Sequence, residues 1–352
     1  MRPLSTERQP FSGGEGGKAG TPWTRGRVLA SLAVLVAGLL VFHDAVPNAV
    51  GNLGSLLETF LPWVGLAVPP LAVLALLRRS ALAAVALLLP VTVWAALFGD
   101  RLPSAGRGAA DPAVPQLTVS RLTVSQLTVS QLTVSQLTVL QHNVADDNPD
   151  PAGTARALAA AGADLVALEE VTPEALPAYG AALAPDHPHR AVVGTVGLWS
   201  AYPLTDSRPV DIRPKGIEGD WSRGLRTTVR TPYGDVAVYV AHLPSLRVRL
   251  PEGFGSGRRD ESAVALGAAL AAERLERVIL LGDLNGTLDD RGLAPLTTRL
   301  TPAREGFDFS WPVALPVARI DHVMTRAMIP VSTWTLPATG SDHLPVMARV
   351  RF

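Results

Sequence analysis

The sequence Gly-Ser-Asp-His-Leu-Pro-Val at positions 340–346 places an acid next to an imidazole, between a glycine and a proline. The following run, Val-Met-Ala-Arg-Val-Arg-Phe at 346–352, predicts a closing strand. A histidine beside an aspartate at a strand edge can act as a general base or as a metal ligand. On these residues alone, a turn in which Ser341 and Asp342 cap the backbone is an equally good interpretation. The residues upstream decide between the two.

Polar residues recur upstream wherever a short apolar strand is predicted to end. One carboxylate after a strand usually caps a turn or a helix, but repeated endings drawn only from Asn, Glu, Asp and His are hard to obtain from capping. Carboxylate and amide oxygens suit Mg²⁺, and imidazoles beside them suit proton transfer around a phosphoryl group. The residues alone therefore indicate a metal-dependent phosphoesterase. The endings are Asn143, Glu169 with Glu170, His242, Asp283 with Asn285, Asp321 with His322, and Asp342 with His343.

From residue 141 onward, short apolar strands alternate with Ala-rich helical segments. Several strands are wholly apolar, which predicts sheets that are covered on both faces and a layered α/β or α+β domain. The expected helices lie at about 151–162, 173–184, 261–276 and 291–300. The expected strands lie at about 137–144, 164–168, 191–199, 226–231, 235–242, 277–282, 318–324 and 346–352.

In this order and spacing, the motifs resemble the endonuclease/exonuclease/phosphatase superfamily, the DNase I-like group. The resemblance covers residues 136–352. It implies a four-layer sandwich of two mixed β-sheets flanked by helices, with a catalytic metal, Mg²⁺ or alternatively Mn²⁺. The motifs are Gln-His-Asn-Val, Leu-Glu-Glu-Val, Ala-His-Leu, Gly-Asp-Leu-Asn, Arg-Ile-Asp-His and Ser-Asp-His-Leu-Pro-Val.

The resemblance implies a metal site at three residues. Glu170 matches the metal-binding Glu of the family, and Asn143 matches the Asn that holds the metal or the phosphate. Asp342 matches the acid before the last histidine, which is often linked to a metal. Ala145 stands where some nucleases have an acid, so a second metal contact is not expected there. Glu169 replaces a Gln and is interpreted as a second-shell or surface acid.

The resemblance also implies five catalytic residues. Asp283 and Asn285 match the pair that orients the attacking water and holds the phosphoryl oxygens. His343 matches the general base or transition-state stabiliser, with Asp321 as its orienting acid. His242 matches the histidine near the leaving-group oxygen. The remaining histidines of this region are expected not to be catalytic: His142, His187, His189 and His322.

A Gly-rich loop after residue 250 leads to Arg258 and Arg259. Arginine pairs suit phosphate or diphosphate oxygens, so both are candidate substrate-binding residues. A solvated flexible loop is an equally good interpretation.

The N-terminal part predicts a membrane domain at 28–98 with three transmembrane helices, at about 28–46, 56–77 and 81–97. A cleaved signal peptide is the alternative for the first segment. Prolines at 62, 69 and 70 predict a kink in the second.

Charge predicts the orientation of these segments. Five basic residues precede the first segment, and Arg78 and Arg79 separate the second from the third. The positive-inside rule places both regions in the cytoplasm. Three spans then make the protein a multi-pass protein of the cell membrane with an extracytoplasmic catalytic domain. Two spans would instead place the catalytic domain in the cytoplasm.

Residues 1–27 are expected to be a disordered cytoplasmic tail, and 99–135 a linker that contains a pentapeptide repeat. An odd repeat turns each copy over relative to the one before, so only one copy can fit a given sheet. The last copy, from Gln136, is expected to form the first strand of the catalytic domain. A pentapeptide β-solenoid is the alternative.

The composition limits the chemistry and the partners. The chain has no cysteine, which excludes disulfides, a thiolate nucleophile and Cys-ligated zinc. Residues 141–352 carry 21 basic and 25 acidic side chains, whereas proteins that grip long nucleic acid usually carry a basic surplus. Nucleic acid is therefore not expected as a partner.

Three functional hypotheses follow. The first is a membrane-anchored phosphoesterase that acts outside the cytoplasmic membrane. Three spans and this domain also resemble the VanJ-like membrane proteins linked to glycopeptide resistance, which implies lipid-linked phosphates or diphosphates of the cell envelope as substrates. The second is an extracellular nuclease or phospholipid phosphodiesterase. The third is a non-catalytic membrane binding protein that keeps the fold.

Overall fold

The computed structural model describes residues 26–102, 135–249, 253–303 and 306–352. The chain forms two compact units. The helical unit comprises the residues up to Val41 together with Val64–Trp94, and the sandwich unit comprises Phe42–Trp63 together with Ala95–Phe352. Residues 1–25 of the expected tail and most of the pentapeptide linker at 99–135 lie outside the described residues, and Arg27 begins a helix.

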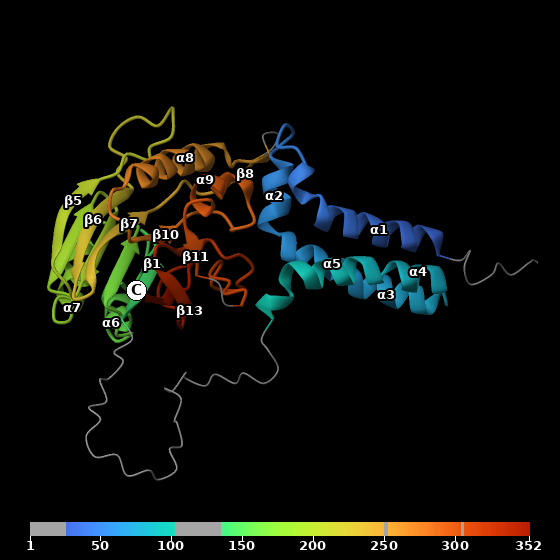
Figure 1. The fold of residues 1–352 in the computed structure, drawn as a ribbon, viewed down its shortest axis with the longest axis horizontal. Helices are drawn as coiled ribbons and strands as arrows, with labels where there is room; N and C mark the ends of the chain where they lie inside the picture. The colour runs from blue at the N-terminus through green and yellow to red at the C-terminus, as the bar shows by residue number, and fades with distance from the viewer. Residues whose placement is uncertain (1–25, 103–134, 250–252, 304–305) are drawn as a thin grey trace, which may run out of the picture. The chain divides into compact units, whose positions relative to one another are not determined.

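Two mixed six-stranded sheets make up most of the sandwich unit (Figure 1). The first sheet has the order β13-β14-β1-β2-β4-β3, and the second has the order β11-β12-β10-β7-β6-β5. The strands of the first are β1 (Gln136–Asn143), β2 (Leu165–Glu169), β3 (His189–Val193), β4 (Val196–Ser200), β13 (Ile329–Thr335) and β14 (Val346–Arg351). Those of the second are β5 (Leu204–Pro209), β6 (Gly224–Thr231), β7 (Gly234–Ala241), β10 (Val278–Asp283), β11 (Thr301–Pro302) and β12 (Asp321–Arg326). A small ribbon joins β8 (Val248–Arg249) to β9 (Gly253–Phe254).

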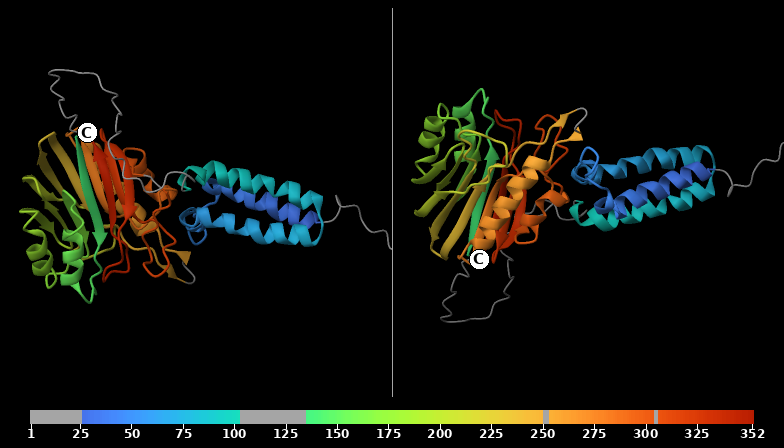
Figure 2. Two further views of the ribbon diagram at one scale, coloured as in Figure 1. Left: turned by 90° about the horizontal axis from the view of Figure 1, so that it is seen from below. Right: turned by 90° about the horizontal axis from the view of Figure 1, so that it is seen from above.

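Three apolar layers hold this unit together, and its helices lie outside the sheets (Figure 2). Val139 and Ile279 belong to the layer between the sheets. Leu266 of α8 packs on the second sheet, and Leu158 of α6 packs on the first. The expected four-layer α/β sandwich is confirmed. The helices of this unit are α2 (Leu53–Thr59), α6 (Pro151–Ala159), α7 (Leu176–Leu183), α8 (Gly257–Ala272) and α9 (Ala294–Thr297), with short 3₁₀ turns at His43–Ala45, Gly99–Arg101 and Arg291–Leu293.

The last copy of the pentapeptide repeat forms the beginning of β1, as expected. This strand lies inside the first sheet, where it pairs antiparallel with β14 and parallel with β2. Its alternate side chains Leu137 and Val139 enter the inter-sheet layer. The register of this copy therefore fixes which of its residues face the core.

The largest differences from the expected strands occur at the sheet edges. The predicted strand 191–199 is a hairpin of β3 and β4 around Gly194, which has φ +55°. β5 and β13 were not predicted, because both are edge strands with partly exposed, mixed sequences. An edge strand lacks the continuous apolar pattern that identifies a buried one.

Helices α1 (Arg27–Val41), α3 (Val68–Leu77), α4 (Ala81–Ala86) and α5 (Leu88–Phe98) form the helical unit, with Leu61–Ala67 as a 3₁₀ segment before α3. Helix α1 packs against α3 and α4, and small side chains such as Ala33 and Ala37 lie on its buried face. The outer faces are apolar as well. All but four of the exposed large hydrophobic side chains among the described residues precede residue 103; the four exceptions are Val264, Leu315, Ile329 and Val331.

One described helix, Ala81–Arg101, is long and apolar enough to cross a membrane. Leu53–Thr59 and Leu61–Leu77 meet the criterion only as a pair bent by 78°, and Arg27–Val41 is shorter. The bend lies next to Pro62, where a kink was predicted. The described residues therefore do not form the three straight spans that were expected. The expected second span also differs because its first part, up to Trp63, belongs to the sandwich unit.

Candidate active site

Polar side chains gather where the inter-sheet apolar layer ends, at one edge of the sandwich. Asp283, the last residue of β10, is the Cα partner of Asp321, the first residue of β12. Asp283 also continues the row of Ile279 and Leu281, which face the inter-sheet layer. Because side chains alternate along a strand, Asp283 points into the same gap. The polar residues that continue such rows are Gln141, Asn143, Glu169, His242, Asp283 and Asp321.

Gly282 allows this edge to form. It has φ +155°, and a Cβ added there would overlap the carbonyl oxygen of Ala241 in β7. Only glycine avoids that overlap, so β7 and β10 approach each other closely just before Asp283.

Asp321 and His343 form a buried ion pair. His343 Nδ1 donates to Asp321 Oδ2 at 2.8 Å. Burial alone would lower the pKa of His343, but the charges of Asp321 and Asp283 outweigh it and raise this pKa to about 10. Burial would likewise raise the pKa of Asp321, and the neighbouring His343 lowers it. His343 therefore carries a proton at neutral pH and presents Nε2–H to the site.

Gln141 connects this pair to a second buried acid. Its Nε2 donates to Asp321 Oδ1 at 2.9 Å and to Glu169 Oε2 at 2.9 Å. Burial, followed by the charges of Asp321 and Asp283, raises the pKa of Glu169 well above its ordinary value. Glu169 is fully buried, so it is not a surface acid. It contacts Asp321 through Gln141.

Two further carboxylates converge on the other side of the site. Asn143 Nδ2 donates to Glu170 Oε1 and to Asp283 Oδ2, each at 3.1 Å. The side-chain Oδ1 of Asn143 accepts from the Ala145 N–H, so this side chain presents its amide nitrogen to the acids. Burial raises the pKa of Asp283 to about 7. The burial of these acids disfavours their charged forms, and a bound cation would offset this effect.

His242 faces the same carboxylates as a neutral ring. Arg223 Nη1 donates to its Nδ1 at 3.3 Å, which leaves the ring proton on Nε2. Burial, together with the charges of Arg223 and His343, lowers the pKa of His242 to about 3. Its Nε2 lies 3.6 Å from both Glu170 Oε1 and Asp283 Oδ2. His242 is thus a buried N–H donor directed into the site.

Asn285 and Glu170 adopt backbone conformations that are uncommon for residues with side chains, with φ +46° and +58°. Asn285 uses its own N–H and its Nδ2 to hold Asp283, and Nδ2 also donates to the Leu243 carbonyl. The Oε2 atom of Glu170 accepts from the Asp146 N–H. Such conformations are characteristic of positions where the surroundings fix a functional group.

The donor set fits a divalent cation at Glu170 and Asp283. Their oxygens converge, because Asn143 Nδ2 bonds Glu170 Oε1 and Asp283 Oδ2 at 3.1 Å each, and both oxygens lie 3.6 Å from His242 Nε2. Carboxylate oxygens are ligands that Mg²⁺ prefers. Ligand atoms of Asp283, Asp321 and His343 also lie within 4.8 Å of one another. That trio is a poorer metal site, because Asp321 and His343 bond each other and a protonated imidazole cannot bind a metal.

Asp342 lies at the rim, with its side chain 63% exposed. Its Oδ1 is 3.9 Å from His343 Nε2, and its Oδ2 accepts from Trp311 Nε1 at 3.1 Å. The structure thus brings seven of the predicted residues into the site and Asp342 to its edge. The seven are Asn143, Glu170, His242, Asp283, Asn285, Asp321 and His343.

The two predicted arginines differ sharply. Arg258 is exposed, whereas Arg259 is fully buried. Arg259 Nη2 bonds Asp290 Oδ2 at 2.6 Å, and its other nitrogens reach Asp260 and the Asn285 carbonyl. The expected substrate contact of Arg259 is therefore wrong in this structure, because its guanidinium is already occupied. It instead fixes the backbone that carries Asn285.

The histidines that were set aside take packing roles where their contacts are known. The ring of His322 bonds the Gly286 carbonyl at 2.8 Å, next to Asn285. The ring of His142 bonds Thr339 Oγ1 at 2.9 Å, and His187 bonds the Ala163 carbonyl at 2.8 Å.

A pocket of about 500 Å³ opens onto the site and has a wall that sequence analysis missed. Leu56 and Phe60, from the segment Phe42–Trp63, line it together with Asp283 and His343. This segment is fixed to the sandwich by Glu58, which is buried and bonds Arg291 at 2.7 Å. The remaining apolar lining residues are Ala145, Leu246, Phe254, Trp311, Ala318 and Ile320.

The model of the Endonuclease/Exonuclease/phosphatase family matches residues 140–343. The chain belongs to this family. The matched range runs from β1 through His343 and contains all seven of the residues that meet in the site. Membership indicates a hydrolase that acts on phosphate esters and generally depends on a divalent metal. No curated protein matches the chain.

Solved structures with the same fold include a family member from Bacteroides thetaiotaomicron, with 17% identity and a TM-score of 0.52 over 62% of this chain and 98% of that one. A family member from Bacteroides vulgatus has 17% identity and a TM-score of 0.51 over 62% and 99%. TDP2 from D. rerio, in complex with a single-strand DNA product, has 17% identity and a TM-score of 0.51 over 62% and 100%. These similarities support the fold.

Proposed function

We propose that this protein is a membrane-anchored, Mg²⁺-dependent phosphoesterase whose substrate carries an apolar chain on its phosphate, as a lipid-linked phosphate or diphosphate does. One observation supports it most strongly: the pocket at the catalytic residues has a polar floor and an apolar wall. Asp283 and His343 lie at the floor, and Leu56 and Phe60 belong to the wall. A substrate that is charged at one end and apolar beyond it matches both.

In this proposal the residues of the chain divide the work on the phosphoryl group. His343, held in a fixed orientation by Asp321, donates from Nε2 to a phosphoryl oxygen and stabilises the charge that develops there. His242 donates from Nε2 on the leaving-group side. Asn285 and Asp283 position the attacking water.

Glu170 and Asp283 would hold the cation, and Mn²⁺ is an alternative to Mg²⁺. When bound, the cation polarises the phosphoryl oxygens and neutralises their charge. Asn143 keeps the two carboxylates at the spacing that binding requires. Asp342, at the rim, is proposed as a further acidic contact of the metal site.

Membrane attachment is supported by the outer surface of the helical unit. Within the apolar helix Ala81–Arg101, only 22% of the most apolar window is buried, so the core of a soluble domain does not account for it. Segment Phe42–Trp63, which contributes Leu56 and Phe60 to the pocket, continues directly into apolar helices at both of its ends.

The proposed side of the membrane follows from charge. Segment Phe42–Trp63 belongs to the sandwich unit and contains no Lys or Arg, whereas Arg27, Arg78 and Arg79 lie at the other ends of the same helices. Positive charge favours the cytoplasmic side. We therefore place the catalytic domain outside the cytoplasm in a multi-pass arrangement.

The full chain in detergent, supplied with Mg²⁺, tests this proposal. We expect phosphate release from farnesyl phosphate with a kcat/KM at least about 10-fold above that for glycerol 3-phosphate, since each buried CH₂ contributes about 0.8 kcal/mol. EDTA should abolish release. Degradation of plasmid DNA without hydrolysis of either phosphate would favour a nuclease instead, and absence of all hydrolysis would favour a binding protein.

A further inference from the structure

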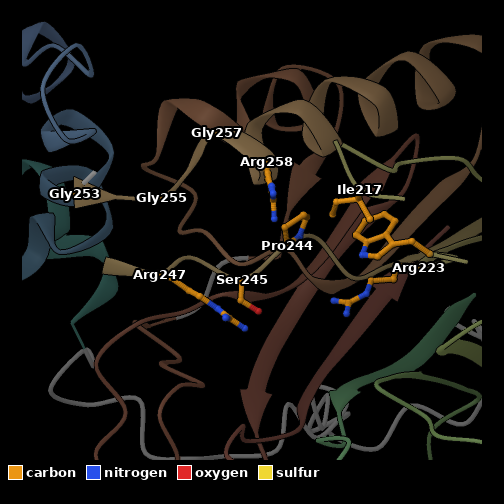
Figure 3. A pocket seen from close by; sticks show the side chains of 10 residues that line it. Ile217, Arg223, Pro244, Ser245, Arg247, Gly253, Gly255, Gly257 and Arg258 are labelled. Carbon is orange, nitrogen blue, oxygen red and sulfur yellow. The ribbon is translucent and has the colours of Figure 1, made fainter. Parts of the chain in front are cut away.

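A second pocket of about 520 Å³ adjoins the catalytic residues, and the charged residues of its lining are three arginines. Arg223 precedes β6, Arg247 follows the end of β7, and Arg258 lies in the first turn of α8. Figure 3 shows their side chains entering the hollow from three different segments. We call this the arginine pocket.

The positive charge of this pocket is not neutralised by the described residues. None of them places a carboxylate within 4.0 Å of Arg223, Arg247 or Arg258. Arg259 differs in this respect, because two aspartates occupy its guanidinium. Three guanidinium groups that have no acidic partner among the described residues surround one hollow, and they repel each other unless an anion joins them. Their planar N–H donors match the oxygens of a phosphate group.

The backbone adds to this preference. The 16-residue helix α8 begins at Gly257, which lines the pocket next to Arg258. The first N–H groups of a helix have no intrahelical acceptor, and the positive end of the helix dipole favours an anion. The only acid in the first turn, Asp260, is held by Arg259 and by Ser256.

Two residues connect the arginine pocket to the catalytic centre. Arg223 donates to His242 Nδ1 at 3.3 Å, while His242 Nε2 faces Glu170 and Asp283. Ser245 lines both this pocket and the catalytic one. An anion bound by Arg223 would therefore lie on the leaving-group side of a phosphoryl group at the catalytic centre.

We infer that the arginine pocket binds a second phosphate group of the substrate, one that is attached to the phosphoryl group under attack. The inference rests on the proposed phosphoesterase function. In the hydrolysis of such a P–O–P substrate, the water oxygen bonds to the attacked phosphorus and its proton ends on the released phosphates. The bridging oxygen keeps the electron pair of the broken bond and leaves with the phosphate held by the arginines.

A binding measurement tests the subsite without requiring turnover. Methylenediphosphonate and methylphosphonate, neither of which can be hydrolysed at P–O–P, are titrated calorimetrically into the full chain in detergent with EDTA. We expect the diphosphonate to bind at least about 10-fold more tightly, because charge-assisted bonds to the second phosphonate are strong. Arg247→Gln/Arg258→Gln should reduce this margin to about 2-fold or less.

The matched control is Arg230→Gln/Arg274→Gln, which removes the same charge from two exposed positions that do not line the arginine pocket. This control variant should keep the difference in affinity between the diphosphonate and the monophosphonate. A margin that survives in the Arg247/Arg258 variant would overturn the inference. So would an equal loss in both double variants, since that would reflect net charge alone.

Hydrolysis of farnesyl diphosphate and farnesyl phosphate separates this inference from the proposed function. We expect the ratio of their kcat/KM values to fall about 10-fold in Arg247→Gln/Arg258→Gln and to stay constant in the control. An unchanged ratio overturns the subsite. If neither ester is hydrolysed but the diphosphonate margin is present, the proposed function fails and the anion subsite stands.

Discussion

Asp321 Oδ2 lies 2.8 Å from His343 Nδ1, and both side chains are buried at the edge where the two sheets meet. This hydrogen bond fixes the orientation of the imidazole and keeps it protonated, so that Nε2–H faces the acidic side of the site. Asp321 also accepts from Gln141, which anchors the pair to β1. The orientation of His343 therefore depends on strands of both sheets.

Replacing Asp321 with Asn should reduce kcat on farnesyl phosphate by about 10²-fold to 10⁴-fold, because His343 loses its charged partner. Circular dichroism should show an unchanged fold. His343→Ala combined with Asp321→Asn should cost little more than His343→Ala alone, since the two act as a unit. Additive losses would mean that Asp321 does not act through His343.

Glu170→Gln should weaken Mg²⁺ binding by at least about 100-fold, since it removes a charged oxygen from the proposed site. Electron paramagnetic resonance of bound Mn²⁺ measures this without turnover. Glu174→Gln is the control, because Glu174 is exposed nearby in the chain. Equal affinity in the two variants would place the metal elsewhere.

Leu56→Ala and Phe60→Ala should each reduce kcat/KM for farnesyl phosphate by about 10-fold and affect glycerol 3-phosphate much less, because they remove apolar contact area. Leu53→Ala on the same helix is the control; its side chain is 49% exposed and does not line the pocket. The pocket wall would have no role in recognition if both substrates lost activity equally.

A buried pair remote from the site gives a pH prediction. Arg226 bonds Glu273 at 2.9 Å. Burial would raise the pKa of Glu273, but bonds from Arg226, the Leu275 N–H and Tyr239 lower it from 4.5 to about 2. Because the folded pKa is the lower one, this stabilisation is complete above pH 4.5 and is lost as pH falls toward 2.

Glu273→Gln should therefore lower the free energy of unfolding by roughly 3 kcal/mol at neutral pH. It should also flatten the fall in thermal midpoint between pH 4.5 and 2. Glu276→Gln, at an exposed position three residues away, is the control. A Glu273 variant that kept the full pH dependence would show that other carboxylates are responsible.

The strand ends were predictable because a buried strand has an unbroken apolar sequence and its polar terminus stands out. Because side chains alternate between the two faces of a strand, Asp283 and His242 then point into the same gap between the sheets. The same alternation could have identified Gln141, two residues after Val139. Arg223 had no such signal, because its contact with His242 depends on how β6 pairs with β7.

The wrong expectation for Arg259 has a physical cause. Helix α8 begins at Gly257, earlier than predicted, and its buried face includes Arg259, Ala263, Leu266 and Leu270. A helix that starts there turns Arg259 inward and leaves Arg258 outside, since neighbours differ by about 100°. Leu56 and Phe60 were assigned to a span because apolar sequence alone does not distinguish lipid from a pocket wall.

The most direct test of the account is phosphate release from farnesyl phosphate by the full chain with Mg²⁺, compared between the wild type and His343→Ala at equal protein concentration. We predict that the wild type releases phosphate and that His343→Ala is at least about 10³-fold slower. Equal rates in the two proteins would contradict the assignment of this edge as the active site.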